Sequence, residues 1–594
     1  MQGLVGVMQT DDTLEQQLAA AVAAFETGEL DQALEMTRRL CANYPDVAIV
    51  HNVHGVVAAG RGDLEVAIDS YRRAIELEPG NCDVHFNLGN VLRDRGDLNG
   101  AYASYRLALR YRPNDVDVLF NLAGVLRRLG DLKSAAEIFQ ELVNASPEDP
   151  AAHNNLGGVL FRLGKSDAAT RCFRRALELH PQYVTAHDNL CEVLEKTNQT
   201  DELRKAVTAA QAQCPPNNIR IAIRRAQLLR RDDEPGKARK VLAKVLRFHP
   251  AQPHLNSAYW YLMGDICDRL RDQQAGYDAF VEANKWAGKA AAERNLQPQD
   301  FITRLGNLQT AYRTVRRKPQ QQATGTAGAP QLVFLIGFPR SGTTLLDTVL
   351  LSHSRISVVE EKPMVQDMVR LARSWQEGQT PNHEDLTGEQ IQELRDAYMT
   401  RLFEHLPGDV GEDQVVIDKL PLNIVEAGLI SKVFPEAVFL LVLRHPCDCV
   451  LSCFMQDFRL NNAMSNFLDL KSAAQCYDKV MSLWTTYRET LPLKLHTVKY
   501  EQVVADLQGT VSQVLEFLGL DWEETMADYR ATALDRKRIG TPSYHQVVQP
   551  VYNRAADRWR LYRAHMIPVL PTLLRWAAIY GYTDDAGKTK GDND

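Results

Sequence analysis

One period dominates the first half of this chain, because marker residues recur every 34 positions. The glycines of the series are Gly28, Gly62, Gly96, Gly130 and Gly164, and the prolines are Pro45, Pro79, Pro113, Pro147, Pro181 and Pro215. Alanines keep the same interval from Ala33 to Ala169, and aromatic residues join as Tyr71, Tyr105, Phe139 and Phe173. Glycine suits a turn between two helices, alanine allows close helix contact, the aromatic fills the core between them, and proline ends the unit. The period therefore predicts stacked helical pairs that bury a core together.

The repeat length and these marks resemble tetratricopeptide repeats over about residues 14–290. Five units are clear. The sixth, from Asn189 to Pro215, is degenerate at the turn, and the seventh ends at Pro250 after a one-residue slip. Tyr259–Lys289 is either an eighth unit or a capping helix pair. The resemblance implies an all-α superhelix whose concave face is made by the first helix of each pair.

A second series lies inside the first, with asparagines 34 positions apart at Asn87, Asn121, Asn155 and Asn189. An asparagine amide offers donors and an acceptor that match a peptide backbone unit. The repeats resemble those of O-GlcNAc transferases, in which an asparagine ladder grips an extended polypeptide. The resemblance implies a protein or peptide partner in the repeat groove. In the alternative interpretation these asparagines stabilise neighbouring repeats.

The 34-residue period disappears after about residue 310. Arg313–Gln331 is rich in Gln, Gly, Ala and Thr, which is typical of a flexible connector. We therefore expect a repeat array at 14–290, a connecting helix and flexible linker at 291–330, a second domain at 331–582 and a polar tail at 583–594.

Charge and hydropathy exclude several classes of protein. The formal net charge of −7 gives no overall basic character that would recruit nucleic acid or anionic lipid. The N-terminal segment lacks the basic and apolar regions of a secretory signal, and the longest apolar runs are much shorter than the roughly 20 residues that span a bilayer. The ten cysteines show no paired metal-ligand spacing. These features predict a cytoplasmic protein with no membrane or nucleic-acid partner, and they leave the oligomeric state open.

A glycine-rich motif opens the second domain. The apolar run Leu332–Ile336 predicts a strand, the motif Gly337-Phe-Pro-Arg-Ser-Gly-Thr-Thr344 follows, and an apolar helical stretch runs on to Leu351. Strand, glycine turn and helix in this order predict an anion site built from backbone amides.

The motif differs from the nucleoside-triphosphatase P-loop at one informative position. Gly337 and Gly342 have the P-loop spacing, but Thr343 replaces the lysine and the cation comes earlier, as Arg340. This difference disfavours a Mg²⁺-ATP hydrolase. A later predicted strand, Val438–Leu443, ends in Arg444, which suits a second anion. Two anion sites predict a ligand with separated phosphates.

The residues 338–344 resemble the 5′-phosphosulfate loop of sulfotransferases, and Arg444 with Ser452 resembles their 3′-phosphate segment. The arginine in the loop and the Glu360-Glu361 pair are most similar to tyrosylprotein sulfotransferases. The resemblance spans about residues 330–570. It implies an α/β P-loop-like domain with a mainly parallel sheet, 3′-phosphoadenylyl sulfate (PAPS) as co-substrate, adenosine 3′,5′-bisphosphate (PAP) as product, and no metal.

The resemblance also implies roles for individual residues. Donor binding is expected of Arg340, Ser341, Gly342, Thr343, Thr344, Arg444, Ser452, Tyr500 and Arg558. Catalytic roles are expected of four residues: Glu361 as general base, Arg340 and Lys419 at the leaving group, and Ser543 closing over the donor. The chain departs from the family at Arg558, where a lysine is usual and arginine keeps the charge but changes its geometry. It also departs in the 3′-phosphate segment at Gln456, where an arginine is usual, and Arg459 lies three residues on.

Alternatives remain for several of these residues. Glu360 is the base if the register slips by one. Lys419 is a surface lysine opposite Asp418 in the structural interpretation, Arg444 belongs to a strand-end salt bridge, and Tyr500 packs in the core. His353 rivals the glutamates as base, but its position after the loop helix favours a structural role.

The leading hypothesis is a sulfotransferase that moves a sulfuryl group from PAPS to a hydroxyl, with tyrosine in a protein or peptide as a candidate acceptor. Glycans and small molecules stay open as acceptors. Two other classes are considered: a repeat-based interaction scaffold with an inactive nucleotide-binding domain, and a nucleotide-dependent kinase. Deletion of residues 1–300 is expected to spare donor binding.

Overall fold

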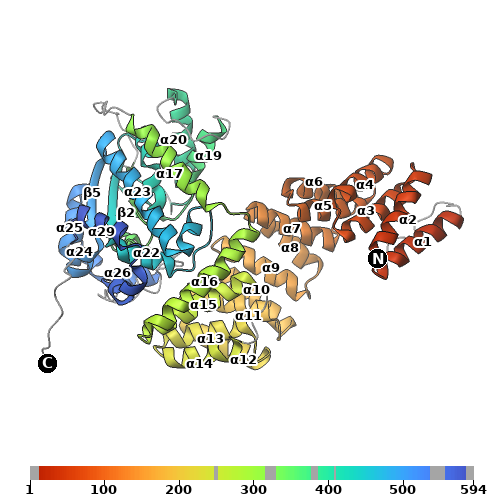
Figure 1. The fold of residues 1–594 in the computed structure, drawn as a ribbon, viewed down its shortest axis with the longest axis horizontal. Helices are drawn as coiled ribbons and strands as arrows, with labels where there is room; N and C mark the ends of the chain where they lie inside the picture. Colours follow the sequence, from red (N-terminus) through yellow and green to blue (C-terminus); the bar gives the residue numbers. More distant parts are fainter. Residues whose placement is uncertain are drawn as a thin grey trace. The chain divides into compact units, whose positions relative to one another are not determined.

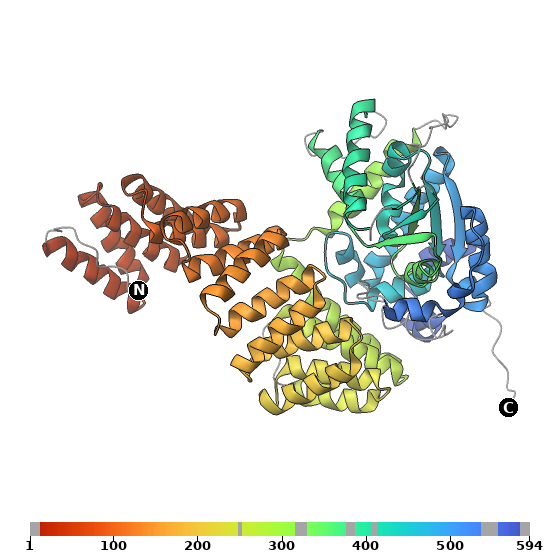
Figure 2. The same ribbon diagram turned by 180° about the vertical axis from the view of Figure 1, so that it is seen from behind.

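The computed structural model describes residues 12–246, 252–314, 330–375, 386–406, 410–411, 413–535 and 556–582. The chain divides into two compact units, Met1–Pro216 and Asn217–Asp594. Unit 1 is helical, and unit 2 combines further helical pairs with a β-sheet domain (Figures 1 and 2).

Unit 1 is a series of helical pairs, coloured from red through orange to yellow in Figure 1. The pairs are α1 (Asp12–Glu26) and α2 (Leu30–Asn43), α3 (Ala48–Arg61) and α4 (Leu64–Leu77), α5 (Cys82–Arg95) and α6 (Leu98–Tyr111), α7 (Val116–Leu129) and α8 (Leu132–Ala145), α9 (Pro150–Arg162) and α10 (Ser166–Leu179), and α11 (Val184–Lys196) and α12 (Thr200–Gln213). Marker residues such as Ala67, Tyr71, Ala101 and Tyr105 are buried in their core. The expected repeat array is confirmed.

The marker glycines end the first helix of a pair in the left-handed conformation. The φ angles of Gly28, Gly62, Gly96, Gly130 and Gly164 are 83°, 95°, 93°, 90° and 82°. The later turns keep this conformation without glycine, at Asn198 (φ 55°), Asp233 (φ 60°) and Arg271 (φ 59°). Asparagine and aspartate tolerate this region better than most residues, so the turn survives where the glycine signal is lost.

A glycine inside the first helix of several pairs receives the aromatic ring of the second helix. A Cβ atom on Gly55, Gly89, Gly157 or Gly264 would lie 2.6, 2.5, 2.7 or 2.7 Å from the ring of Tyr71, Tyr105, Phe173 or Phe280 respectively. No side chain larger than a hydrogen fits there unless the ring moves. We call each of these contacts a glycine–aromatic socket.

The marker prolines supply a carbonyl to the next helix. Imidazole Nε2 lies 2.8–2.9 Å from a proline oxygen in the pairs His51–Pro45, His85–Pro79, His153–Pro147 and His187–Pro181. These histidines also follow the 34-residue period, except in the fourth unit, where Leu119 takes their place. The contact fixes the start of each first helix.

Unit 2 begins with helices that continue the pairs, and the last three of these helices share a buried core with its sheet domain. They are α13 (Ile219–Arg231), α14 (Pro235–Val245), α15 (Pro253–Arg269) and α16 (Gln273–Glu293), followed by α17 (Pro298–Arg313). Helix α17 lies along α23 (Leu470–Thr490), where the rings of Tyr312 and Tyr487 are 4.8 Å apart. Arg304 of α17 donates to both carboxylate oxygens of Glu426 at 2.6 Å.

The sheet of unit 2 is parallel, with the strand order β2-β3-β1-β4-β5. Its strands are β1 (Gln331–Gly337), β2 (Ile356–Glu360), β3 (Val415–Lys419), β4 (Val438–Leu443) and β5 (Lys494–Lys499). The described helices around it are α18 (Thr343–Leu350), α19 (Met364–Ser374), α20 (Gly388–Phe403), α21 (Ala427–Val433), α22 (Pro446–Phe454), α23, α24 (Tyr500–Ala505), α25 (Leu507–Leu518), α26 (Tyr529–Asp535), α28 (Arg563–Met566) and α29 (Leu570–Ile579), with short 3₁₀ helices at Pro421–Glu426, Met464–Leu468, Glu524–Asp528 and Arg558–Tyr562.

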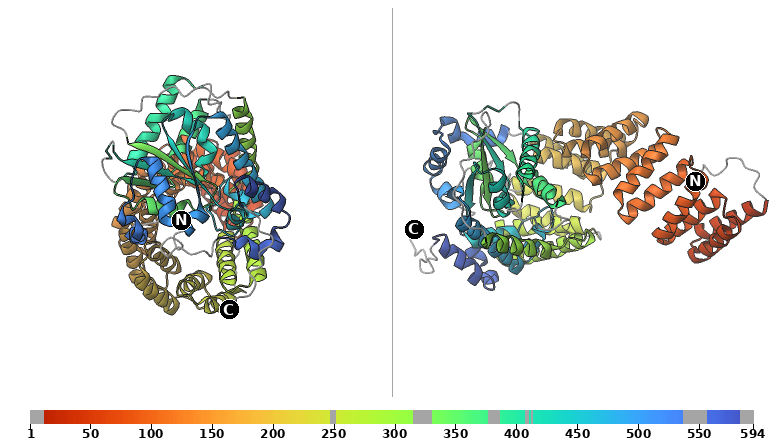
Figure 3. Two further views of the ribbon diagram at one scale, coloured as in Figure 1. Left: turned by 90° about the vertical axis from the view of Figure 1, so that its left-hand side faces the viewer. Right: turned by 90° about the horizontal axis from the view of Figure 1, so that it is seen from above.

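Alternate side chains of the strands enter two different cores. Val333 and Leu335 pack with α18 and α25, whereas Phe334 and Ile336 pack on the other face with α23. Helices therefore cover both faces of the sheet (Figure 3), which agrees with the nearly continuous apolar sequence of β1 and β4. The expected α/β domain is confirmed, and its sheet is parallel throughout the described strands.

Candidate functional site

The candidate site lies at the carboxyl edge of the sheet. Each of the five strands ends in or just before a residue expected there from the sequence: Arg340 after β1, Glu360 and Glu361 at the end of β2, Lys419 at the end of β3, Arg444 after β4 and Tyr500 after β5. In open α/β sheets this edge is where ligands bind. The sheet thus gathers residues that are far apart in the chain.

The loop between β1 and α18 has the geometry of an anion cradle. Arg340 (φ 68°) and Gly342 (φ 103°) both adopt left-handed conformations, and Gly342 leads directly into α18. A Cβ atom on Gly337 would lie 2.6 Å from the Val442 oxygen, so this position requires glycine. Alternating backbone conformations and a helix N-terminus turn amide N–H groups toward one point. Thr343 and Thr344 start the helix and are both buried.

Ser341 strengthens this interpretation. Its side chain is 1% exposed, and its hydroxyl has no hydrogen-bond partner among the described residues. A buried hydroxyl without a partner is costly, which favours a ligand that completes it.

Arg340, Arg444 and Ser452 form one contact network. Arg340 Nε donates to the hydroxyl of Ser452 at 3.1 Å, and an Arg444 N–H donates to the carbonyl oxygen of Arg340 at 3.0 Å. Ser452 lies on α22, whose Cys453 contacts the Pro339 carbonyl at 3.3 Å. The two segments expected to bind separate phosphates are therefore in direct contact.

Tyr500 packs against two residues of the same group, Gly342 and Arg444. Its ring lies against the bare Cα of Gly342, where a Cβ atom would be 2.4 Å from the ring. The Arg444 guanidinium carbon lies 5.1 Å from the centre of that ring, within cation–π range. Tyr500 is half-buried, so it combines a packing role with a place beside the loop.

Lys419 lies among three carboxylates. Its ammonium is 3.3 Å from Asp347 Oδ2, 3.1 Å from Glu360 Oε1 and 3.1 Å from Glu361 Oε1, and both Lys419 and Asp347 are 0% exposed. Burial opposes the charge of Lys419, but the three carboxylates outweigh it and raise the pKa of the ammonium above its ordinary value. The interpretation of Lys419 as a surface lysine is wrong.

The two glutamates differ in exposure and backbone. The Glu361 side chain is 34% exposed, compared with 16% for Glu360. Glu361 also has a positive φ of 48°, and its N–H donates to the Lys419 oxygen at 2.8 Å. Strained backbone in a non-glycine residue is often found at functional sites. These observations favour Glu361 over Glu360 as the more accessible carboxylate.

The other residues expected from the sequence are not seen in the contact network of Arg340, Arg444 and Ser452. Arg558 pairs with Asp268 of α15 at 2.9 Å. Ser543 lies outside the described residues. His353 is buried, and its two ring nitrogens contact the Asp521 oxygen and the Arg355 N–H, both at 3.0 Å, which favours a structural role. Gln456 contacts the Asp457 oxygen at 3.4 Å.

Two acidic residues near the site were missed from the sequence. Asp347 is the only acidic residue in the apolar helix α18, and Asp448 is the only one in α22. Asp448 accepts hydrogen bonds from the Asp557 and Trp559 N–H groups, both at 2.9 Å, and burial raises its pKa to about 6 although Arg444 acts against this. A lone acid in a buried helix beside an anion loop is the signal that could have identified both.

The asparagine series of unit 1 makes contacts between repeats. Asn87 Nδ2 donates to Asn52 at 3.3 Å, Asn189 Nδ2 donates to Asn154 at 2.9 Å, and Asn121 accepts from Arg93 at 2.8 Å. Asn155 is half-buried, like the other three. These bonds are those expected if the asparagines stabilise neighbouring repeats, and peptide binding stays a prediction.

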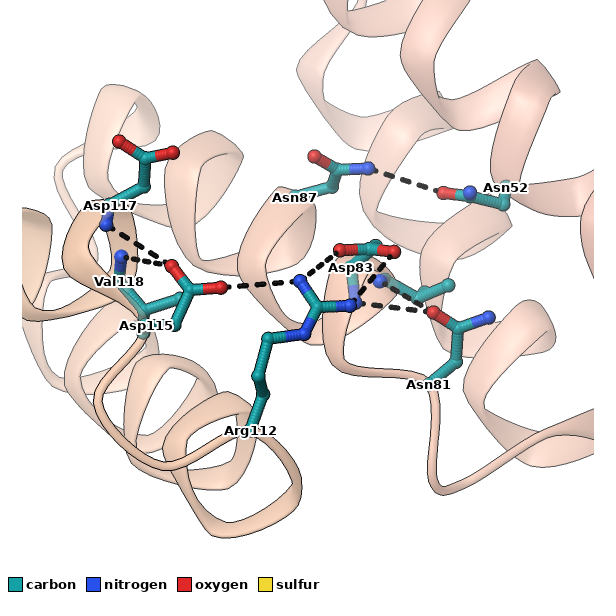
Figure 4. A network of polar contacts seen from close by, with 9 residues as sticks. Asn52, Asn81, Asp83, Asn87, Arg112, Asp115, Asp117 and Val118 are labelled. Atoms are coloured by element: carbon teal, nitrogen blue, oxygen red, sulfur yellow. Dashed lines mark hydrogen bonds and ion pairs between the residues drawn. The ribbon is translucent and has the colours of Figure 1, made fainter. Parts of the chain in front are cut away.

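Figure 4 shows the Asn87–Asn52 contact and, beside it, a charged contact that also joins neighbouring repeats. Arg112, at the end of α6, lies 3.0 Å from Asp83 of α5 and 3.2 Å from Asp115, which caps α7. The hydrogen bonds that Arg112 donates to Asp83 and, to a smaller extent, to Asp115 raise the pKa of Arg112. The arginine thus joins the starts of two successive first helices.

None of the described helices combines the length and the apolar character needed to cross a bilayer. Within the same residues there is no group of three or more His, Cys, Asp or Glu side chains placed to hold a metal ion.

A parallel sheet with helices on both faces defines an α/β protein, and the glycine-turned loop and two arginines at its carboxyl edge form a candidate site for an anionic ligand. Residues 330–524 match the sulfotransferase family, and residues 17–46, 60–92, 86–151 and 150–183 match tetratricopeptide repeat models. The chain is therefore a tetratricopeptide-repeat protein with a sulfotransferase-family domain.

Relatives of the chain include a protein of Aquifex aeolicus described as uncharacterized, 22% identical over 346 residues, and the protein-tyrosine sulfotransferase 2 of Gallus gallus, 24% identical over 247 residues. The matches cover 56% and 38% of this chain, and 43% and 62% of the relatives. The match thus spans less than half of the length of the first relative and less than two thirds of the length of the second. Among solved structures, YrrB, titled a TPR protein with an unusual peptide-binding site, matches 31% of this chain and 95% of its own at 21% identity, with a TM-score of 0.29.

Proposed function

We propose that the α/β domain transfers a sulfuryl group from PAPS to an acceptor hydroxyl, with tyrosine in a protein or peptide as the acceptor. The observation that carries the proposal is the gathering of Arg340, Arg444, Lys419 and Glu361 at one edge of the sheet. Phosphoryl-type transfer chiefly needs a positioned donor, neutralised charge on the leaving group and a base for the hydroxyl. These four residues can meet those needs.

The residues of the loop fit the donor. The buried Ser341 hydroxyl has no partner among the described residues, and the start of α18 offers backbone N–H groups for one phosphate. Arg444 and Ser452 would hold the second phosphate, next to Arg340. When bound, PAPS supplies the activated sulfuryl group.

Each catalytic residue then has one task. Arg340 places a fixed positive charge beside the leaving phosphate, and Lys419 adds a second cation at the same edge. Glu361 accepts the proton of the acceptor hydroxyl as the new S–O bond forms and the S–O bond to the 5′-phosphate of the donor breaks, which releases PAP with the bonding electrons. Its Oε1 is held by Lys419, so we assign the proton to Oε2.

Two observations support a protein or peptide acceptor. The relatives of known activity that match this domain are named protein-tyrosine sulfotransferases. The same chain carries an array of repeats, an architecture that presents extended binding surfaces. The repeat groove is proposed to hold the polypeptide that contains the acceptor.

Calorimetric titration with PAP and with ATP·Mg²⁺ tests the proposal. We expect the wild-type protein to bind PAP, and we expect Arg340→Gln to weaken this binding at least tenfold. Arg355→Gln is the matched control, because Arg355 is exposed, donates to the Asp413 oxygen at 2.9 Å and precedes β2 at the opposite edge of the sheet.

The remaining outcomes separate the alternatives. Binding of ATP·Mg²⁺ in place of PAP would indicate a kinase, and binding of neither would indicate a scaffold with an inactive domain. Sulfuryl transfer from PAPS to a panel of tyrosine peptides, glycans and small hydroxyl compounds then identifies the acceptor class.

A further inference from the structure

The last helical pair of the repeat array, α15 and α16, shares a hydrophobic core with the sulfotransferase-family domain. Tyr261, Phe280 and Ala283 of this pair belong to the same buried cluster as α22 and α23. The Tyr277 ring of α16 stacks on His565 at 3.9 Å and lies 5.5 Å from the Phe454 ring of α22. This pair is therefore part of the domain's own packing.

Helix α22 is one of the elements that this pair contacts. It begins just after Arg444 and carries Ser452, so its position sets the distance between the two arginines of the candidate site. At its end, Asn284 of α16 donates to the Phe454 oxygen at 3.0 Å. Asn284 itself is buried and accepts from the hydroxyl of Tyr261. The repeat thus holds the carboxyl end of α22.

A second contact holds the start of α22. Asp268 of α15 pairs with Arg558 at 2.9 Å and accepts from the Tyr562 hydroxyl at 2.6 Å. The neighbours of Arg558, namely Asp557 and Trp559, donate their N–H groups to Asp448 in the first turn of α22. Trp559 also stacks on His445, with ring centres 5.2 Å apart.

We propose that Asp268 is a positioning residue for the nucleotide site, through its hold on Arg558 and the segment 557–559 against helix α22. The proposal rests on the proposed function, since it concerns the same PAP site. Asp268 acts through other residues and touches neither nucleotide nor acceptor. The last helical pair of the repeats, α15 and α16, therefore helps to set the geometry of the donor site. A deletion of residues 1–300 would remove Asp268 and Asn284, so the expectation that this deletion spares donor binding does not follow from the structure.

Substitution of Asp268 in the full-length chain tests this inference. Asp268→Asn keeps an acceptor for Tyr562 but removes the charge that holds Arg558. We expect it to weaken PAP binding about tenfold in calorimetry, to raise the KM for PAPS and to change kcat at saturating donor much less. Asp268→Glu should restore part of the affinity.

Asp272→Asn is the matched control. Asp272 lies in the turn between α15 and α16, caps α16 through the Ala275 N–H and pairs with Arg239 of α14. Asparagine is also a good N-cap, so this variant loses an ion pair within the repeats without altering the domain contacts. Its PAP affinity should equal that of the wild type.

A double-mutant cycle with Arg558→Gln separates direct coupling from general damage. Because both variants break the same contact, the double variant should bind PAP as weakly as Arg558→Gln alone. Independent, additive losses would overturn the proposal. So would Asp268→Asn with wild-type PAP affinity and KM.

Two further results decide the remaining cases. If Asp268→Asn is unfolded in a thermal melt, Arg558→Gln replaces it, because it breaks the same ion pair from the other side, and unchanged PAP affinity in that variant rejects the inference. If the wild-type protein does not bind PAP at all, the proposed function fails first. Binding by the wild type that is insensitive to position 268 rejects only the inference.

Discussion

The ammonium of Lys419 lies 3.1 Å from Glu361 Oε1. Lys419 is the last residue of β3, and Glu361 directly follows the neighbouring strand β2. It also reaches Glu360 at 3.1 Å and the fully buried Asp347 at 3.3 Å. One cation therefore organises the carboxylates on this side of the site, and its contact with Glu361 orients the proposed base.

Glu361→Gln tests the assignment of the base. An amide of the same shape cannot accept the proton, so kcat for transfer from PAPS should fall about 100- to 10,000-fold while PAP affinity changes little. Glu360→Gln is the matched control, because it breaks an equally short contact with Lys419. A larger loss of kcat in Glu360→Gln would move the base to that position.

Lys419→Met tests the structural role of the buried cation. The substitution leaves Asp347, Glu360 and Glu361 without their common partner, and removal of one member of a buried ion pair destabilises proteins by about 3–5 kcal/mol. We expect a decrease of that size in the free energy of unfolding in urea. Lys494→Met, at an exposed position at the start of β5, should stay within about 0.5 kcal/mol of the wild type. Equal stability of both variants would refute the role given to Lys419.

Asp418 predicts a dependence of stability on pH. Burial raises the pKa of this carboxyl to about 7, although the hydroxyl of Tyr398, which donates at 2.8 Å, and Lys419 act in the opposite direction. Because the folded state holds the proton more tightly than the unfolded chain, the stabilisation from Asp418 is present below about pH 4 and is lost as the pH rises through 7. Asp418→Asn removes this loss, so its urea midpoint relative to wild type should increase between pH 5 and pH 8. A constant difference would contradict the prediction.

Gly89→Ala tests the glycine–aromatic sockets. The added Cβ atom would lie 2.5 Å from the Tyr105 ring, so we expect a loss of about 1–3 kcal/mol in stability. Gly124→Ala is the control, since nothing lies within 4 Å of a Cβ atom at that helical position. There alanine should stabilise by about 0.5–1 kcal/mol, and thermal melts of the two variants should shift in opposite directions.

The sequence predicted the repeats well where a residue type is required by backbone geometry. The turn glycines take positive φ angles, and Gly55 and Gly89 lack space for a side chain. Prediction weakened where another residue meets the same need, as at Asn198 and Asp233, because asparagine and aspartate are common outside turns as well.

The candidate site was predictable through its strand ends. Arg340, Lys419 and Arg444 each follow an apolar run, and parallel strands bring such ends to one edge. Partners that act across the fold could not be predicted. Asn284 and Phe454 are 170 positions apart, and no local pattern marks either as a contact. The same is true of Asp347, which pairs with Lys419 only after the sheet has formed.

The sockets also bear on the order in which the chain acquires structure. Gly55 and Tyr71, or Gly157 and Phe173, belong to the same helical hairpin, so each contact closes only a short loop. Chains rich in such local contacts fold faster than those that depend on distant strand pairing. Since synthesis begins at the N-terminus, we expect the repeat hairpins to form on the ribosome while the strands of the parallel sheet are still being made.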